Sequence, residues 1–294
     1  MRPEQLGDLA IPSDPRLHPD GERIAFVVTR LDLGEDKYLR RIWIWDGAEA
    51  RPLTSGQADT TPRWSPDGSK LAFIRKGPGD DDKPQLAILD MGGGEAEIVG
   101  DFPLGALEAE WSPDGSKIAV VAAEWIADLA DVDADDHKRR PRRVTQFPYR
   151  FDNMGWVGDR RTHIHLVDVA TGESEQLTSG DFNESGVAWT PNGAELAFAS
   201  ARHEDRGLDC GSQVWTISGD GGEPTARTEI GFWGGPSYDP AGRLYVSGIA
   251  ELWGHPDVAP LYRIEDDRVL ADLTGHLDRN VAPLAPTISP PSPQ

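Results

Sequence analysis

The stretch that decides the fold is Trp64-Ser-Pro-Asp-Gly-Ser-Lys-Leu-Ala-Phe-Ile74. The same pattern of an aromatic or apolar residue, a tight polar turn and a short apolar run returns four more times. The other copies begin at Leu17, Trp111, Trp189 and Tyr238, and the last two are the weaker ones. Proline presets the backbone at the second turn position, Asp or Asn suits the third, and glycine takes the left-handed position that closes the turn. Each copy therefore predicts a β-hairpin.

The spacing of the copies indicates a repeat architecture. The turn glycines are 47, 47, 78 and 49 residues apart, so one copy carries a long insertion: Gly21, Gly68, Gly115, Gly193 and Gly242. Downstream of each turn lies a second apolar run, followed in most copies by a polar turn and a short closing strand. The second runs are residues 42–45, 86–89, 164–167, 214–217 and 261–264. Four strands per unit of roughly 40 to 50 residues is the signature of a β-propeller blade. We therefore predict an all-β fold, a β-propeller with five recognisable four-stranded blades.

This repeat sets the expected domain organisation. A single propeller is expected over residues 1–280, with an insertion at 124–160 inside the third blade. The predicted blades are residues 11–57, 58–104, 105–180, 181–230 and 231–275. The remaining segment, residues 281–294, is rich in Pro and Ser and has no turn signal, so we expect a disordered tail. Helical periodicity is confined to residues 3–10 and to the surroundings of residues 124–134.

Charge and composition exclude several classes of function. The 294 residues carry 29 Lys plus Arg against 50 Asp plus Glu, a formal net charge of −21. Nucleic acids and anionic membrane surfaces both require a cationic face, so neither is an expected partner. No apolar run reaches the roughly 18 residues of a membrane span, and residues 1–10 are not followed by the apolar segment of an export signal. Cys210 is the single cysteine and is expected to be a small, partly buried apolar residue, which leaves the cytoplasm as the predicted compartment.

The insertion carries a more specific pattern than the turn repeat. It reads Phe147-Pro-Tyr-Arg-Phe-Asp-Asn-Met-Gly-Trp156, then Asp159-Arg-Arg-Thr-His-Ile-His-Leu-Val-Asp168. These segments, with Ala201-Arg-His-Glu-Asp-Arg206 and the opening Pro3-Glu-Gln-Leu-Gly-Asp-Leu9, resemble the propeller of prolyl oligopeptidase-family serine peptidases, in the acylaminoacyl-peptidase and dipeptidyl-aminopeptidase-like branch. The resemblance covers residues 3 to 280. It implies a seven-bladed propeller followed by an α/β-hydrolase domain that bears Ser, Asp and His.

The hydrolase part is missing from these residues. The nucleophile of that domain lies in a Gly-x-Ser-x-Gly elbow, and the sequence has no such motif, so no catalytic residue is assigned here. We expect a truncated or split propeller portion that gates the access of oligopeptides to a hydrolase domain and is inactive alone. Self-association is also expected, because an open edge would expose an apolar face of the fifth blade that includes Tyr238, Leu244 and Val246.

The candidate binding residues are Arg150, Phe151 and Trp156, because they lie outside the repeat, in a long loop of the kind that carries binding in propellers. The resemblance implies a role in substrate entry, and the alternative is interdomain packing without substrate contact. A different class of function also stays open, a TolB-like stand-alone scaffold that binds a protein partner. A lactonase-like propeller with a central metal would need matching carboxylates in successive blades, and the sequence shows no such set.

Other polar residues have simpler explanations. His163 and His165 alternate along a strand without a third ligand nearby, so we expect a polar strand face and no metal. Alternating Asp131, Asp133, Asp135 and Asp136 lack the Gly and Glu of a calcium loop, which favours a charged, mobile insertion. The turn aspartates Asp20, Asp67 and Asp114 are expected to stabilise their turns, and Trp64, Trp111 and Trp189 to pack between sheets. No cofactor is expected.

Overall fold

The computed structural model describes residues 2–79, 81–130, 132, 134–151, 155–252, 258–265, 268–277 and 279–281. The described residues form two compact units, one within 2–120 and 166–175 and the other within 121–165 and 176–281. The third sheet contains strands from both units, because their boundary runs through two of its strands. The predicted tail lies outside the described residues from position 282 onward.

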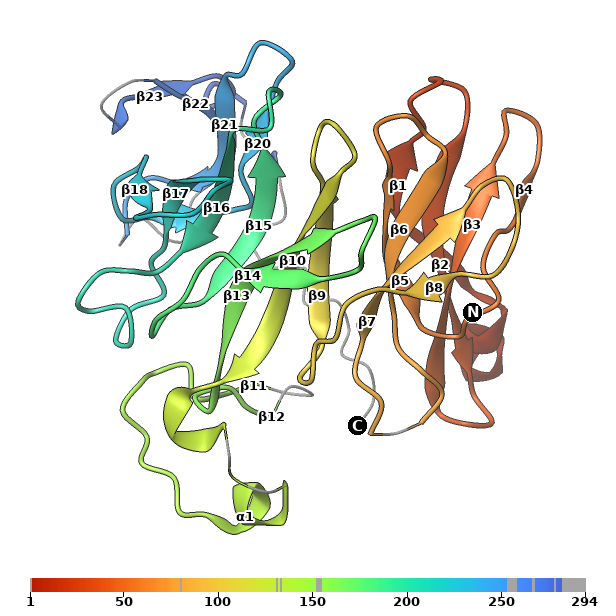
Figure 1. Ribbon diagram of the computed structural model, residues 1–294, viewed down its shortest axis with the longest axis horizontal. Helices are drawn as coiled ribbons and strands as arrows, with labels where there is room; N and C mark the ends of the chain where they lie inside the picture. The colour runs from red at the N-terminus through yellow and green to blue at the C-terminus, as the bar shows by residue number, and fades with distance from the viewer. Residues whose placement is uncertain are drawn as a thin grey trace. The chain divides into compact units, whose positions relative to one another are not determined.

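Four four-stranded sheets and a final five-stranded one follow one another along the chain, which confirms the all-β propeller prediction (Figure 1). The first contains β1 (Ala10–Leu17), β2 (Ile24–Asp32), β3 (Lys37–Trp45) and β4 (Ala50–Pro52). The second contains β5 (Asp59–Trp64), β6 (Lys70–Arg75), β7 (Gln85–Asp90) and β8 (Glu97–Ile98). The third contains β9 (Ala106–Trp111), β10 (Lys117–Trp125), β13 (Arg160–Asp168) and β14 (Ser174–Gln176).

The fourth sheet contains β15 (Glu184–Trp189), β16 (Glu195–Ser200), β17 (Gln213–Ser218) and β18 (Thr225–Ala226). In the fifth, the first strand is broken into two pieces that both pair with the second strand. This sheet contains β19 (Phe232–Trp233), β20 (Ser237–Tyr238), β21 (Leu244–Ile249), β22 (Leu261–Ile264) and β23 (Leu270–Asp272). The break falls at Gly234, Gly235 and Pro236, because proline cannot donate to the ladder and glycine weakens a strand. All five second apolar runs of the sequence lie within the third strands of their sheets.

The turns between first and second strands share one construction. In the second sheet the carboxylate of Asp67 accepts the N–H of Ser69 at 3.0 Å, and in the third Asp114 accepts that of Ser116 at 3.0 Å. Asp20 and Asn192 do the same in the first and fourth sheets. In the fifth sheet the carboxylate comes from Asp239, at the first turn position. All five turn glycines have φ between 70° and 80°. The expected structural role of the turn aspartates is therefore confirmed.

The first strands of three sheets carry a bulge at equivalent positions. The register shifts between Ser13 and Arg16 in β1 and between Thr60 and Arg63 in β5, and β15 shifts in the same way. The backbone takes a left-handed conformation at each bulge, with φ of 46° at Asp14, 57° at Thr61 and 66° at Gly186. Glycine adopts this conformation without strain, whereas a β-branched threonine does not. Thr61 is therefore a strained position that the surrounding strands hold in place.

The core lies between successive sheets. In the first unit, Val27 and Ile42 from the first sheet pack against Trp64 and Phe73 from the second, and all four are buried. Trp64 also donates its indole N–H to the carbonyl of Arg16 at 3.0 Å. Trp111 and Trp189 are buried in the same way, at 5% and 9% exposure. The indole N–H of Trp111 donates to the carbonyl of Arg63 in the second sheet, so packing between sheets is confirmed for Trp64 and Trp111, and burial is confirmed for Trp189.

One prediction about exposed surface is wrong. In the second unit, Leu244 and Val246 are 4% and 1% exposed, and they form a cluster with Ala197 and Val214 of the fourth sheet. Tyr238 packs against the same cluster. Residues alternate between the two faces of a strand, and these positions lie on the face toward the fourth sheet rather than the opposite one. Cys210 also differs from expectation, because it is exposed.

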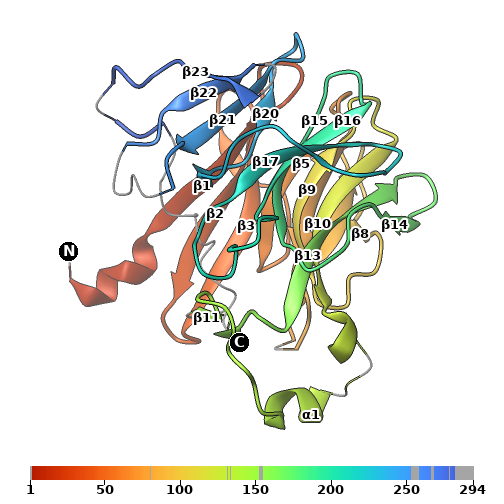
Figure 2. The ribbon, with the colours of Figure 1, turned by 90° about the vertical axis from the view of Figure 1, so that its left-hand side faces the viewer.

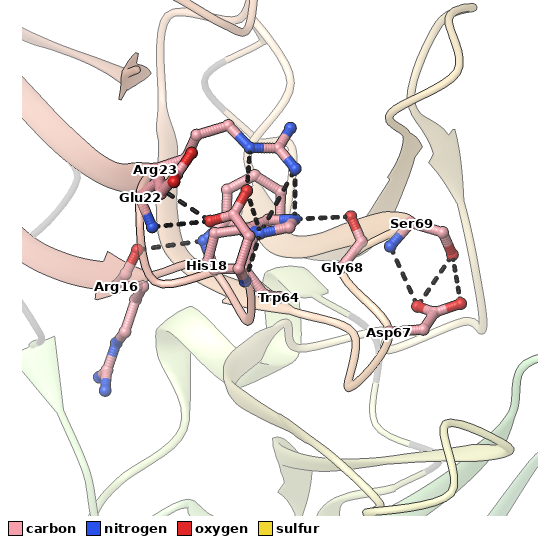
Figure 3. Close-up of polar contacts among 9 residues, drawn as sticks. Arg16, His18, Glu22, Arg23, Trp64, Asp67, Gly68 and Ser69 are labelled. Carbon is pink, nitrogen blue, oxygen red and sulfur yellow. Dashed lines mark hydrogen bonds and ion pairs between the residues drawn. The ribbon is translucent and has the colours of Figure 1, made fainter. Parts of the chain in front are cut away.

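A polar contact joins the turns of the first and second sheets (Figure 3). The buried His18 ring lies with Nε2 at 3.1 Å from the carbonyl oxygen of Gly68, while its Nδ1 accepts the N–H of Asp20 at 3.0 Å. The guanidinium of Arg23 lies against the same ring and pairs with Asp20 at 2.7 Å. The ring meets Trp64 edge-on at a centroid distance of 4.6 Å. His18 therefore occupies the position at which the second and third sheets carry Ser65 and Ser112, and it contacts the next turn directly.

Helices are short in this protein. They comprise the 3₁₀ helices η1 (Pro3–Asp8) and η2 (Ala127–Leu129) and the helix α1 (Ala134–Arg139). None of the helices in the described part of the chain has the length and apolar character to cross a bilayer.

Candidate functional site

The two ends of each sheet carry connecting loops of different length. Antiparallel strands place the connection between second and third strands at the end opposite the Pro-Asp-Gly turns. In four of the five sheets this connection is the longer one, as at residues 76–84, 126–159, 201–212 and 250–260. Both ribbon views place α1 and the insertion beyond that end of β10 and β13 (Figures 1 and 2). The five sheets therefore differ in loop length mainly at this end.

The insertion is a packed structure with a small core of its own. Its base is closed by the N–H of Ile126, which donates to the carbonyl of Asp159 at 3.1 Å. The rings of Trp125 and His137 stack with centroids 4.0 Å apart, and His137 and Leu129 are buried. The reading of this segment as merely charged and mobile is therefore too simple for its described part. Of the acidic residues that were compared with a calcium loop, Asp131 and Asp133 lie outside the described residues, and Asp136 is exposed.

The three predicted site residues lie on one small hairpin within the insertion. β11 (Arg150–Phe151) pairs with β12 (Gly155–Trp156), so that Arg150 faces Trp156 across the ladder. The guanidinium of Arg150 lies 5.9 Å from the centroid of the Trp156 ring. Tyr149 approaches the same ring, with centroids 5.7 Å apart, whereas Phe151 is 44% exposed. The structure thus brings Arg150 and Trp156 together and leaves Phe151 on the surface.

Trp156 forms part of the wall of a cavity of about 270 Å³ in the second unit. Four arginines line this cavity: Arg140, Arg142, Arg143 and Arg161. Arg142 lies 4.9 Å from the centroid of Trp156, closer than Arg150 does. Arg150 and Phe151 are not in the cavity wall. Sequence reasoning missed the four arginines, although the run Lys138-Arg-Arg-Pro-Arg-Arg143 beside Trp156 was a usable signal.

Two of the four arginines are neutralised by acids in the same wall. Arg142 contacts Asp159 at 3.0 Å, and Arg161 donates to Asp181 at 2.7 Å. Burial pushes the pKa of Asp181 upward, but hydrogen bonds and charge from Arg161 and Arg206 outweigh this and leave the pKa below its ordinary value. Within the described residues, Arg140 and Arg143 have no such acid partner, so the cavity has an excess of positive charge.

The loop between β16 and β17 supports the insertion from the side. The N–H of Phe147 donates to the carbonyl of Gly207 at 2.6 Å, and a Cβ on Gly207 would lie only 3.1 Å from the side chain of Gln146. In the same loop His203 pairs with Asp209 at 2.9 Å, and Arg206 reaches Asp181 at 2.8 Å. Two segments that are far apart in sequence therefore fix one cavity.

His163 and His165, considered above as possible metal ligands, have other roles. Glu184 is 1% exposed, and its carboxylate contacts His163 at 2.8 Å and Arg202 at 2.5 Å. His165 pairs with Glu124 at 2.8 Å, and burial lowers its pKa despite that carboxylate. The expectation of a polar strand face is corrected in one respect, because both imidazoles are buried against acids. Among the described residues, no group of three potential metal ligands comes together.

Comparisons with known proteins bear on this geometry. No family model matches the sequence. An uncharacterized peptidase, YuxL of Bacillus subtilis (strain 168), is 33% identical over 195 residues, which are 64% of this chain and 29% of that protein. The acylaminoacyl peptidase of Pyrococcus horikoshii matches with a TM-score of 0.70 at 21% identity, over 94% of this chain and 41% of that one. The fold is a β-propeller like that of this acylaminoacyl peptidase.

Two further points qualify the likeness to this peptidase propeller. A putative TolB from Agrobacterium tumefaciens has the same fold, with a TM-score of 0.59 at 19% identity over 90% of this chain and 80% of that one. The chain spans less than a third of the curated peptidase and about two fifths of the acylaminoacyl peptidase. The resemblance drawn from residues 147–168 is thus confirmed for the propeller portion.

Proposed function

We propose that this chain is the propeller portion of a serine peptidase of the prolyl oligopeptidase family, and that the arginine-lined cavity receives oligopeptides on their way to a hydrolase domain. The observation that carries the proposal is the cavity itself, in a peptidase-type propeller. It lies within an insertion outside the blade repeat and combines an aromatic wall with excess positive charge. Arginine binds carboxylates through paired, charge-assisted hydrogen bonds, and every unblocked peptide ends in a carboxylate.

Each part of the cavity has a role in this proposal. Arg143 is exposed and Arg140 half-buried, so both can meet a peptide carboxylate at the cavity mouth. Trp156 and Tyr149 supply an apolar wall for the side chains of the peptide. The pairs Arg142–Asp159 and Arg161–Asp181 hold the wall in place, which limits the size of what enters. Bond cleavage is assigned to a hydrolase domain, since the nucleophile elbow is missing from these residues.

Binding to the 294-residue chain tests the first step. We expect a short peptide with a free C-terminal carboxylate to bind in calorimetric titration, and its C-terminal amide to bind about tenfold more weakly. Arg143→Gln should weaken binding of the acid and leave the amide unchanged. Arg41→Gln, which removes an exposed arginine of β3 outside the cavity, is the matched control. Equal binding of acid and amide would contradict the proposal.

Turnover tests the gating step, in the intact peptidase that contains both the propeller and the hydrolase domain. Trp156→Ala should raise kcat/KM for a longer peptide relative to a short chromogenic substrate, because it opens the cavity wall. Arg150→Ala should have a smaller effect, since Arg150 lies behind Trp156 and outside the wall. If both variants keep the original kcat/KM on both substrates and only lower the melting temperature, the segment is packing and the gating proposal fails.

A scaffold that binds a protein partner is the second candidate. It is favoured by exposed apolar side chains beside the cavity, with Phe147 79% and Leu208 66% exposed. The TolB-like fold supports it as well. This candidate predicts that neither the peptide acid nor its amide binds the chain.

A further inference from the structure

The rim of the arginine-lined cavity carries large apolar side chains that face solvent. Val144, Phe147 and Leu208 are 51%, 79% and 66% exposed, and we call these three side chains the apolar rim. Among the large apolar side chains of the described residues, Phe147 and Leu208 are the two most exposed. Exposed apolar side chains that gather in one place mark an interaction site, whereas scattered ones do not.

The apolar rim is continuous with the cavity wall. Val144 is itself a wall residue, and Phe147 follows the wall residue Gln146. The N–H of Phe147 donates to the carbonyl of Gly207 at 2.6 Å, which brings Leu208 to the same part of the rim. A Cβ on Gly207 would lie 3.1 Å from Cγ of Gln146, so this close approach favours glycine there. Two loops therefore form one apolar surface beside the cavity.

The loop that carries Leu208 is held by its own hydrogen bonds. The N–H of Leu208 donates to the carbonyl of Asp205 at 2.8 Å, and His203 contacts both carboxylate oxygens of Asp209 at 2.9 Å. The carboxylate of Asp209 also accepts the N–H of Gly211 at 2.9 Å. The loop is thus ordered while Leu208 points to solvent. A surface that is already ordered loses little conformational entropy when a ligand binds to it.

The cavity is too small for more than the end of a peptide. Its volume of about 270 Å³ lies just below the roughly 300 to 1,000 Å³ of small-ligand pockets. An extended chain advances about 3.3 Å per residue, so the residues before the C-terminal one cross the cavity rim. Arg143, which meets the carboxylate in the proposed function, directly precedes Val144. A peptide anchored at Arg143 therefore lies beside the apolar rim.

From this arrangement we propose that the apolar rim is a second subsite for the same oligopeptides, which binds a large apolar side chain shortly before the peptide's C-terminus. This inference rests on the proposed function, because the carboxylate at Arg143 is its anchor. Burial of the peptide side chain against Phe147 and Leu208 removes apolar surface of both partners from water. Successive side chains of an extended peptide point to opposite sides, so the rim selects one position and not its immediate neighbour.

The test is calorimetric titration of the full chain with tetrapeptide acids that end in phenylalanine. The reference peptide has glycine at its other positions, and three further peptides carry one leucine, placed one, two or three residues before the C-terminal residue. We expect leucine at one position, but not at the adjacent one, to increase affinity about tenfold over the reference. The C-terminal amides of the same peptides are titrated in parallel.

Variants of the rim locate the effect. Phe147→Ser and Leu208→Ser should each reduce the gain from leucine at least threefold, measured on each variant as the ratio to the reference peptide. Ile98→Ser is the matched control, since Ile98 is a 52% exposed apolar residue of β8 in the first unit, and it should retain the full gain. The substituted side chains are exposed, and melting curves check that the variants are folded.

The pattern of outcomes separates this inference from the proposed function. A gain at one position that is lost in Phe147→Ser and kept in Ile98→Ser supports the subsite. Equal gains at all three positions, no gain at any, or a gain that survives both rim variants would show that the inference is wrong. The proposed function would then still hold if the acids bind more tightly than their amides. Equal binding of acids and amides would overturn both.

Discussion

At the scale of single residues, the contact between the turns of the first and second sheets requires glycine at position 68 for two reasons, its backbone conformation and the space that His18 occupies. Gly68 has a φ of 72°, and a Cβ there would lie 2.2 Å from Nε2 of His18. The His18 ring cannot move away easily, because it is buried against Trp64 and held by Arg23 and Asp20. Gly21 has nearly the same φ, 76°, but open space around it.

Comparing the two glycines separates backbone strain from steric clash. We expect Gly21→Ala to lower the free energy of unfolding by about 1–2 kcal/mol, the cost of a left-handed alanine. Gly68→Ala should cost about 1–3 kcal/mol more, because the new methyl group displaces a buried ring. Urea denaturation of both variants measures the difference. Equal destabilisation would mean that the His18 contact contributes nothing to the joint between these turns.

Glu184 is the buried carboxylate of the second unit whose loss we expect to lower the free energy of unfolding strongly. Its removal by Glu184→Ala leaves His163 and Arg202 buried without their acid, and we expect a loss of about 3–5 kcal/mol. Asp181→Ala is the matched control, because Asp181 also pairs with two cations but is 57% exposed. Its loss should cost at most about 1 kcal/mol. Similar losses for both variants would show that burial of the Glu184 cluster is unimportant.

At the scale of elements, the repeated turns predict a common acid sensitivity. Hydrogen bonds from Ser65 and then from Ser69 lower the pKa of Asp67 to about 2, and Ser112 and Ser116 do the same for Asp114. These pKa values lie below the ordinary 3.8, so the ionised carboxylates stabilise the folded state above pH 3.8. That stabilisation is lost as the pH falls from 3.8 toward about 2.

Asparagine offers a way to remove this titration and keep the turn, because Asn192 already occupies the equivalent position in the fourth sheet. We expect the double variant Asp67→Asn, Asp114→Asn to show a shallower fall in melting temperature across this pH range than the original chain. Glu97→Gln, on an exposed strand outside the turns, is the control. An unchanged pH profile in the double variant would contradict this account of the turns.

At the scale of the whole molecule, the first sheet presents an apolar groove of about 380 Å³, lined by Pro12, Pro15, Ile24, Phe26 and Trp45. Leu17 at the end of β1 is 62% exposed as well. We expect a second copy of the chain to associate through this groove, opposed by the net charge of −21. Light scattering should therefore show association that increases with protein concentration and with salt, since salt screens the repulsion.

A charged substitution tests which surface is responsible. Trp45→Glu should reduce this association, whereas Leu208→Glu, at an exposed apolar residue of the second unit, should leave it unchanged. A chain that stays monomeric at high salt would show that the groove is covered or too small to drive association.

The sequence alone determined the architecture, because the turn and the strands of each blade are local. Proline, aspartate and glycine act within five residues, and an apolar run alternates within one strand, so Trp64 to Ile74 already specified a hairpin. The candidate residues Arg150 and Trp156 were found because they interrupt the repeat. The buried positions of Trp64, Trp111 and Trp189 followed from the same regularity.

Only the tertiary structure decided what the polar side chains meet. Glu184 lies 21 residues from His163 and 18 from Arg202, and no local pattern pairs them. The face of Leu244 and Val246 was predicted wrongly, because alternation along a strand shows that two faces exist but not which one meets the neighbouring sheet. The arginine-lined cavity joins segments from different loops, at residues 140–146, 156–161 and 181. Charged residues follow no regular period along the sequence, so the sequence does not predict which of them form ion pairs. The pairs are fixed only when the sheets pack.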